Sequence, residues 1–390
     1  MKSFLLAVSV VCVAAAHASP WNFQELSVAP ASQPSPEHDA GEVKAIFFDG
    51  RPWKGKPTKV FAYYGIPEVP AGQKVPAMVL VHGGGGSAFS AWVKLWVSRG
   101  YAAIAMDTCG SIPSGGQKNH TRNPAGGPGG WGGFDMVDEP LQDQWTYHAV
   151  SDVILAHSWI RSQPGVDAER TGITGISWGG YLTCITSGVD DRFKFAAPVY
   201  GCGFIGENSA WLDQFEKMGP ERKAKWLSNW DPSVYLPNVK VPMLWVTGTN
   251  DFAYPMDSLK KSYGLPKGDR FLAIRPRMPH GHGGAGENPE EIRVMADAIL
   301  KSGVPLMKVS LGKKDGANVS ALFSGKTKAV AAVLNYTLDE GTWQKRNWQE
   351  VPAVIGENKV SASLPEGAKV YYFNVTDERG LISSSEHETL

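Results

Sequence analysis

The sequence Gly175-Ile176-Ser177-Trp178-Gly179-Gly180 has the residue types and spacing of a nucleophile on a tight turn. It follows an apolar run, Thr171–Ile176, and leads into a stretch with helical apolar spacing. A nucleophile between a strand and a helix needs small neighbours, because the turn is strained and the flanking backbones come close. The N-terminus of the helix also favours a developing negative charge. Ser177 is therefore predicted to attack a carbonyl carbon; the alternative is a tight turn without chemistry.

A glycine loop, His82-Gly-Gly-Gly-Gly86, comes directly after the apolar run Ala77–Val81. Such a loop leaves backbone N–H groups free to bind the oxygen of a carbonyl that is being attacked. Gly84 and Trp178, the residue after the nucleophile, are predicted to be the two donors of this oxyanion hole. A phosphate-binding loop would need a terminal Lys-Ser/Thr pair, which is missing here.

An acid and a histidine must follow the serine if the chain has the order seen in α/β-hydrolases. Asp251 ends the strand-like segment Leu244–Asp251, and His280, His282 and His387 follow it. His387 lies in the C-terminal tail, so His282 is predicted to be the base and His280 is the alternative. The acid would fix the tautomer of the imidazole that takes the serine proton. An H-x-H pair near an aspartate could also hold zinc, but no third ligand cluster accompanies it, and no metal site is predicted.

The elements that position these residues alternate between short apolar strands and longer helical segments. This alternation predicts a mostly parallel, doubly wound α/β sheet that binds ligands beyond the carboxyl ends of its strands. Helices are expected at Trp145–Arg161 and Glu290–Leu300. The expected strands are Val60–Gly65, Ala77–Val81, Ala102–Asp107, Thr171–Ile176, Phe195–Tyr200, Leu244–Thr247 and Phe271–Ile274.

Two long segments interrupt this alternation, and both are expected to form walls of a substrate cleft. Gly110–Gly133 is rich in glycine and proline and carries Trp131, with Phe134 directly after it. Cys202–Val239 inserts the aromatic residues Trp211, Phe215, Trp226 and Trp230 between two strands.

The chain is expected to divide into a signal peptide (1–18), a loose leader (19–42), a catalytic α/β domain (43–304) and a C-terminal β-sandwich (305–390). The first segment has one lysine, an apolar stretch and an Ala16-His-Ala18 cleavage site, so the protein is predicted to be secreted or periplasmic, without a membrane span. The last segment contains short strands separated by Asp-Glu-Gly and Pro-Glu-Gly turns.

Composition and cysteine content narrow the function classes. Lys plus Arg and Asp plus Glu both number 38, so nothing in the charge favours nucleic acid as a partner. Three cysteines, Cys109, Cys184 and Cys202, remain after removal of the signal peptide and cannot form a disulfide framework. A single bridge between Cys109 and Cys202 is left open.

From about Val43 to Gly303 the chain resembles the dienelactone-hydrolase and prolyl-oligopeptidase branch of the α/β-hydrolases, including bacterial secreted acetyl xylan esterase-like proteins. The resemblance is carried by Val79–Gly86, Gly172–Gly180, Gly248–Asp251 and His280–Gly283. It implies the α/β-hydrolase fold and a triad whose histidine precedes a glycine. Unlike the dienelactone hydrolases, this chain has serine as its nucleophile, and no β-propeller is expected ahead of the catalytic domain.

These observations predict a serine hydrolase that cleaves carboxylic esters through an acyl-enzyme, without a cofactor. The expected substrate is a small-molecule or polysaccharide ester, because aromatic cleft walls suit the stacking of sugar rings. One alternative is a serine peptidase or aminopeptidase, for which Glu207 and Asp213 would be the acidic candidates to hold a peptide N-terminus. Another is a non-catalytic carbohydrate-binding protein that uses the C-terminal sandwich.

Overall fold

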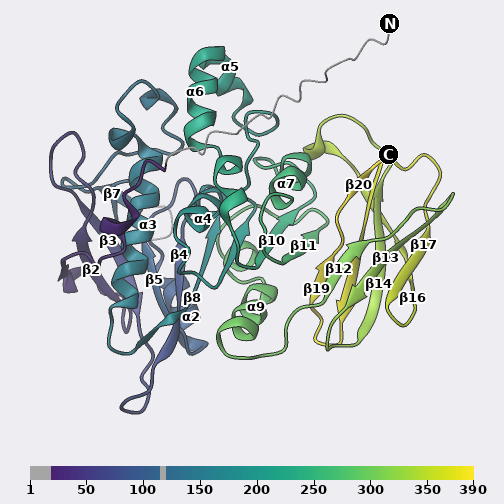
Figure 1. Cartoon of the computed structure of the whole chain (residues 1–390), viewed down its shortest axis with the longest axis horizontal. Helices are drawn as coiled ribbons and strands as arrows, with labels where there is room; N and C mark the ends of the chain where they lie inside the picture. The colour runs from purple at the N-terminus through teal and green to yellow at the C-terminus, as the bar shows by residue number, and fades with distance from the viewer. Residues whose placement is uncertain (1–18, 115–119) are drawn as a thin grey trace, which may run out of the picture.

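The computed structural model describes residues 19–114 and 120–390, and its largest element is a nine-stranded sheet (Figure 1). The strand order is β1-β2-β3-β5-β4-β8-β9-β10-β11. The pairs from β5 through β11 are parallel, whereas β1, β2 and β3 pair antiparallel with their neighbours. The prediction of a mostly parallel sheet is confirmed. The strands are β1 Ser32–Pro34, β2 Lys44–Asp49, β3 Lys59–Gly65, β4 Val75–Val81, β5 Ala102–Met106, β8 Val166–Ile176, β9 Phe195–Val199, β10 Met243–Gly248 and β11 Arg270–Arg275.

Helices cover both faces of this sheet. The ring of Tyr64 in β3 lies 4.7 Å from that of Trp159 in α3, whereas a Cβ on the next residue, Gly65, would lie 2.7 Å from Val97 in α2. Because successive residues of a strand point to opposite faces, α2 and α3 lie on opposite sides of the sheet. The helices are α1 Phe23–Leu26, α2 Ser90–Ser98, α3 Trp145–Arg161, α4 Trp178–Val189, α5 Leu212–Met218, α6 Pro220–Trp230, α7 Met256–Tyr263, α8 Gly284–Glu287 and α9 Glu290–Leu300.

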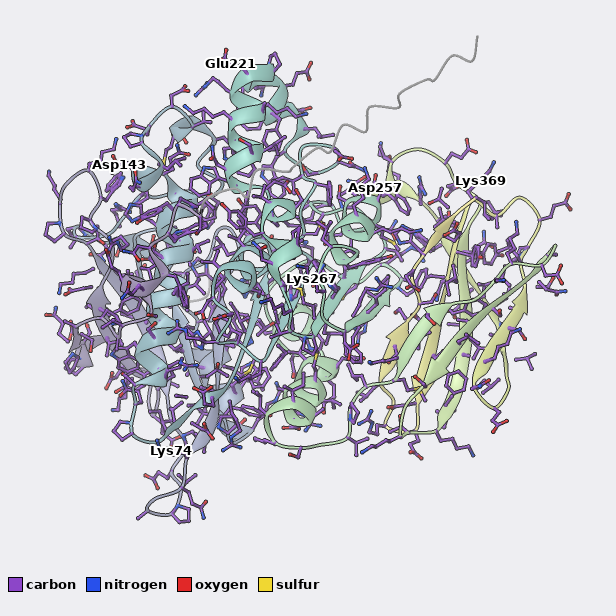
Figure 2. All side chains as sticks on the ribbon, viewed as in Figure 1. Lys74, Asp143, Glu221, Asp257, Lys267 and Lys369 are labelled. Atoms are coloured by element: carbon purple, nitrogen blue, oxygen red, sulfur yellow. The ribbon has the colours of Figure 1, made fainter. Side chains whose placement is uncertain are left out.

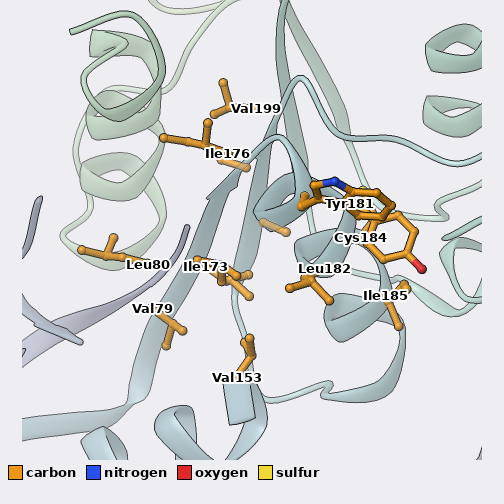
Figure 3. Packing of buried hydrophobic residues seen from close by; sticks show 14 of the residues in the cluster. Val79, Leu80, Val153, Ile173, Ile176, Tyr181, Leu182, Cys184, Ile185 and Val199 are labelled. Atoms are coloured by element: carbon orange, nitrogen blue, oxygen red, sulfur yellow. The ribbon is translucent and has the colours of Figure 1, made fainter. Parts of the chain in front are cut away.

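The central strands are buried along their length, as their continuous apolar sequences predict. Every residue of β4 and β5 is buried. Figure 3 shows Val79 of β4 and Ile173 of β8 in the same apolar cluster as Leu182 and Ile185 of α4. Figure 2 shows Glu221 of α6 at the periphery of the molecule, away from this apolar cluster. The strand and helix that flank Ser177 are therefore anchored in the buried apolar core.

The segment 19–42 is not the loose leader that its Pro-, Ser- and Ala-rich composition suggested. It contains α1, and β1 pairs with β2. Trp21 is buried, stacks on Tyr147 and donates its indole N–H to the Tyr147 carbonyl oxygen at 2.9 Å. Trp21 and Leu26, both buried, thus anchor a segment whose other residues are mostly polar or small. The expected signal peptide, 1–18, lies outside the described residues.

The two insertions are more regular than their sequences suggested. Gly110–Gly133 contains a short hairpin of β6 Ser111–Pro113 and β7 His120–Arg122, with 115–119 outside the described residues. Cys202–Val239 contains the helices α5 and α6, whose aromatic side chains pack mainly on one another and on Phe134. Both insertions leave the sheet at the carboxyl ends of its strands, as expected.

The C-terminal part forms the expected small β-sandwich, beside β11 (Figure 1). Its sheets have the orders β12-β13-β17-β16 and β15-β14-β18-β19, with β20 paired to β18. The edge of β11 is covered because Ile274 donates its N–H to the Ser384 hydroxyl at 2.8 Å and accepts from the Asn374 amide at 3.0 Å. The strands are β12 Lys308–Leu311, β13 Asn318–Ser324, β14 Ala329–Thr337, β15 Trp348–Pro352, β16 Val354–Ile355, β17 Lys359–Ser363, β18 Val370–Asp377, β19 Ile382–Ser384 and β20 Glu388–Thr389.

The cysteines of the described residues, Cys109, Cys184 and Cys202, are all buried and free. The bridge between Cys109 and Cys202 that the sequence left open is not formed. No helix in the described part of the chain combines the length and apolar character that a membrane crossing requires.

Candidate active site

Ser177 stands on the sharp turn between β8 and α4, with φ 58° and ψ −118°. A non-glycine residue with positive φ is strained, and such strain is typical of functional sites. The turn is possible only with small neighbours: a Cβ on Gly175 would lie 2.2 Å from the Gly179 carbonyl oxygen, and one on Gly179 would lie 2.0 Å from that of Val81. The glycines at both positions are therefore a steric requirement of the turn.

The glycine loop after β4 lies directly against this turn. A Cβ on Gly83 would be 3.1 Å from the Cβ of Ser177, and one on Gly84 would be 2.7 Å from the Trp178 ring. Within residues 19–114 and 120–390, the N–H groups of Gly84 and Trp178 have no hydrogen-bond acceptor. These are the two donors predicted from the sequence, and both remain available to a ligand oxygen.

Asp251 and His280 form one histidine–carboxylate pair. Asp251 lies in the loop after β10, where one carboxylate oxygen accepts from the N–H groups of Ala253 and Tyr254 at 2.9 and 2.8 Å. The other oxygen contacts His280 Nδ1 at 2.6 Å. Because the carboxylate accepts, the proton of this imidazole is on Nδ1, and no donor among residues 19–114 and 120–390 occupies the lone pair of Nε2. The hydrogen bond expected between Asp251 and His282 is not formed.

His282 pairs with a different carboxylate. Its Nδ1 lies 3.0 Å from Glu287 Oε1, at the end of α8, and its Nε2 accepts the Gly83 N–H at 2.9 Å. The lone pair of Nε2 is therefore already used by a backbone donor. Glu287 was missed in the sequence analysis; its position five residues after His282 was the available signal. Two histidine–carboxylate pairs thus face one serine.

Aromatic rings fix the two imidazoles in place. His280 is stacked on Tyr200 with ring centroids 4.2 Å apart, and His282 lies 4.3 Å from Phe89. Tyr200, directly after β9, has a positive φ of 64° and donates its hydroxyl to the Pro279 carbonyl oxygen at 2.7 Å. Burial raises the pKa of Tyr200 to about 12, so its hydroxyl remains a donor. The sequence signal for Tyr200 was its place at the end of a parallel strand, next to a glycine.

A cavity of about 530 Å³ lies over Ser177 and is lined by both histidines and the glycine loop. No carboxylate of the described residues lines it, and its aromatic side chains are Phe89, Trp131, Trp178, Trp211 and Phe252. From the insertions, Trp131 and Trp211 reach this cavity. Phe215, Trp226 and Trp230 are instead buried in the packing of α5 and α6, and Phe134 stacks on Trp226. Glu207, a candidate for binding a peptide N-terminus, pairs with Lys261.

One group of side chains in the described residues has the atom types and spacing of metal ligands: His82, Asp107 and Cys109. All three are buried and hydrogen-bonded within the protein. Nε2 of His82 accepts the Thr108 N–H at 3.0 Å, and Asp107 accepts from the N–H groups of Cys109 and Ser111. Burial lowers the pKa of His82 to about 3, raises that of Asp107 to about 6 and raises that of the Cys109 thiol. The cluster therefore joins the glycine loop to the end of β5 through hydrogen bonds within the protein.

Comparisons with known proteins support the same fold. The acetyl xylan esterase family matches residues 35–206, and the prolyl oligopeptidase family matches residues 135–298. Ser177 lies in the overlap, whereas Asp251, His280 and His282 lie in the prolyl oligopeptidase match. The predicted resemblance to this branch of the α/β-hydrolases is confirmed.

Solved structures support the same fold. The acetyl xylan esterase from Paenibacillus sp. R4 has a TM-score of 0.57 and 22% identity, over 72% of this chain and 92% of that one. Acetyl xylan esterase 1 from Thermoanaerobacterium sp. JW/SL YS485 has a TM-score of 0.55 and 16% identity, over 72% of this chain and 94% of that one. The protein therefore has the α/β-hydrolase fold.

The curated relatives are peptidases. Dipeptidyl aminopeptidase BIII of Pseudoxanthomonas mexicana is 28% identical over 203 residues, which are 45% of this chain and 25% of that protein. The chain spans about a quarter of the length of the curated relatives it matches. Taken together, the matches support a hydrolase, in a branch that includes both esterases and peptidases.

Proposed function

We propose that the protein is a serine hydrolase that cleaves carboxylic esters through an acyl-enzyme, with Ser177 as the nucleophile. One observation carries this proposal: a strained serine lies in an aromatic cavity beside two unused N–H donors and a histidine–carboxylate pair with a free Nε2. The N–H groups of Gly84 and Trp178 would hold the oxyanion. Loss of one such donor typically lowers turnover by about 10²–10³.

We assign Asp251 and His280 as the acid and the base. The base must accept the Ser177 proton on a free lone pair, and His280 Nε2 has one, whereas the lone pair of His282 is used by Gly83. His282 was predicted to be the base from its spacing, so the hydrogen bonds favour the alternative. His282 and Glu287 then hold the glycine loop by its Gly83 N–H, which makes them positioning residues for the oxyanion hole.

Catalysis then follows from these positions. His280 takes the proton of Ser177 as the hydroxyl attacks the ester carbonyl, and Asp251 stabilises the imidazolium that forms. His280 returns the proton to the departing alcohol, which leaves an acyl group on Ser177. Water, activated by the same imidazole, releases the acid.

An ester is a better fit to the cavity than a peptide. An aminopeptidase must hold a charged N-terminal ammonium group, and the described lining of the cavity contains no carboxylate. Trp131 and Trp211 offer flat apolar faces of the kind on which sugar rings stack. An acylated carbohydrate is therefore the proposed substrate, and export to the periplasm or the medium, proposed from 1–18, would bring the protein to it. The peptidase remains the second candidate because of the curated relatives.

The test compares hydrolysis of p-nitrophenyl acetate with that of Pro- and Ala-p-nitroanilide, for the wild type and Ser177→Ala. Ester turnover that disappears in the variant, with both anilides intact, is the expected result. Cleavage of the anilides would replace the esterase by the peptidase. Equal ester turnover in both proteins would refute the role of Ser177.

A further inference from the structure

A second hollow, of about 420 Å³, adjoins the cavity over Ser177 and is formed by both parts of the chain. The two hollows share Phe252 and His280. Phe252 is 59% exposed, and its ring lies 4.6 Å from that of His280. A molecule bound at Ser177 can therefore extend past His280 into this second hollow, here named the junction groove.

The wall that the C-terminal sandwich contributes to the junction groove is firmly held. The Asn250 amide donates to the carbonyl oxygens of Trp343, Gln344 and Arg346 at 3.4, 3.2 and 2.7 Å. The loop between β14 and β15 is thus attached to the residue that precedes the catalytic acid. The groove is consequently a fixed part of the site and not a gap between loosely joined domains.

Three cations line the junction groove: Arg277, Lys345 and Arg346. Arg277 donates to the amide oxygen of Asn347, and Arg346 donates to the Gly341 carbonyl oxygen, so both guanidinium groups bind neutral acceptors. In the described part of the chain, none of the three cations forms an ion pair with a carboxylate. Lys345 is exposed and its ammonium group makes no hydrogen bond there.

Nearby carboxylates offset this charge only in part: Asp257, Asp339 and Glu340 act electrostatically on Arg346, and Asp339 accepts the Asn347 N–H at 2.6 Å, which leaves Arg277 and Lys345. Asp251 lines the groove, but its side chain is fully buried and bonded to His280. Asp257, on α7 (Figure 2), accepts from the Asn208 amide, and Glu340 pairs with Lys369. The groove therefore presents positive charge directly beside the proposed base.

We infer that the junction groove binds a carboxylate on the alcohol portion of the ester, as an acidic sugar in an acylated saccharide would present. The general acid must touch the oxygen of the leaving alcohol, so a groove that begins at His280 lies on the leaving-group side. Guanidinium groups suit carboxylates because their paired N–H donors match the two oxygens. This inference rests on the proposed function, because it uses His280 as the acid that protonates the alcohol.

The test measures acetate release from acetylated glucuronic acid and from acetylated glucose, for the wild type and the double variant Arg277→Gln/Lys345→Gln. Exposed ion pairs are individually weak, so we expect the double variant to lose about fivefold in kcat/KM on acetylated glucuronic acid, through a higher KM. On acetylated glucose its kcat/KM should change by less than about twofold. Added 1 M NaCl should reduce the preference of the wild type for the charged substrate. The matched control is Lys359→Gln, an exposed lysine of the same sandwich that lies outside both hollows.

Two outcomes would overturn the inference: an equal fall on both sugars, or a fall in the Lys359→Gln control as large as in the double variant. A charge preference seen only with an acidic acyl group, tested with mono-p-nitrophenyl succinate against p-nitrophenyl butyrate, would refute the leaving-group assignment. Binding of glucuronate and glucose to Ser177→Ala, followed by tryptophan fluorescence, tests the groove without turnover. Selective glucuronate binding that disappears in the double variant would support the groove even if the esterase proposal failed.

Discussion

Replacement of His280 and His282 one at a time separates the two imidazoles that face Ser177. His280→Ala removes the group whose Nε2 is free and whose Nδ1 bonds to Asp251. His282→Gln keeps one donor and one acceptor at the position that bonds Glu287 and the Gly83 N–H. We expect the first change to slow acyl transfer strongly and the second to slow it only slightly.

The hydrogen bonds of each histidine set the expected difference in rate between the two variants. General acid–base catalysis contributes about 10²–10⁴ to a rate, and His280 would supply it in both acylation and deacylation. The glutamine introduced by His282→Gln can retain one of the two bonds, so this variant should lose about 1 kcal/mol, or roughly fivefold in rate. The two variants should therefore differ by at least about tenfold, and by about 10² or more if the histidine contribution is typical.

The assay is release of p-nitrophenolate from p-nitrophenyl acetate, in single-turnover and steady-state conditions. The two carboxylates that bond these histidines give a second pair of variants. Asp251→Asn should lower turnover by about 10³–10⁴ because it disturbs the tautomer of the base, whereas Glu287→Gln should have a small effect on turnover. If His282→Gln and Glu287→Gln are as inactive as Ser177→Ala while the His280 variant remains active, the assignment of the base is reversed and our lone-pair argument is refuted.

Three further changes test the supports of the site. Tyr200→Phe removes the donor to the Pro279 carbonyl oxygen. The free energy of unfolding should fall by about 1–3 kcal/mol, and kcat in the ester assay should also fall. An unchanged kcat would show that Tyr200 does not position the base. Gly179→Ala places a Cβ 2.0 Å from a backbone oxygen, so it should lower the free energy of unfolding by about 2–3 kcal/mol and remove the activity. Gly284→Ala, with open space around its Cβ, should change neither stability nor activity. Burial raises the pKa of Asp152 well above its ordinary value of 3.8, so its folded form favours the proton and its stabilising contribution is lost as pH rises. In thermal unfolding, the stability of Asp152→Asn relative to the wild type should therefore increase from about pH 4 towards neutrality. A difference in stability that stays constant with pH would refute this.

Much of the fold could be predicted because it depends on local patterns. Short apolar strand patterns, several of them continuous apolar runs, predicted seven strands of the catalytic part, and each corresponds to an observed strand. The glycines around Ser177 predicted the turn because a Cβ has no space there. The ordered segment 19–42 was missed because its position depends on Trp21, which packs against residues more than a hundred positions away. Local composition carries no signal of such a contact.

The choice between the two histidines shows where sequence reasoning ends. His280 and His282 are two residues apart on one loop, and both precede a glycine. Which imidazole reaches Asp251 is decided by the rings around each: Tyr200 stacks on His280, and Phe89 lies against His282. These rings come from other elements of the sheet edge, so spacing along the chain could not predict the pairing.

The C-terminal sandwich contacts the elements that carry the candidate site. Its side chains occupy the open edge of β11, the strand that leads to both histidines. The Arg346 carbonyl oxygen, in the loop between β14 and β15, accepts from the Asn250 amide. This contact fixes the position of the adjacent Asp251 through the backbone. Trp343 and Trp348, whose rings would have to be exposed to serve as a platform for a polymer, are buried at this contact. The sandwich therefore contributes to the site through the position of the acid and the charge of the junction groove, and a separate binding module is not needed to explain its presence.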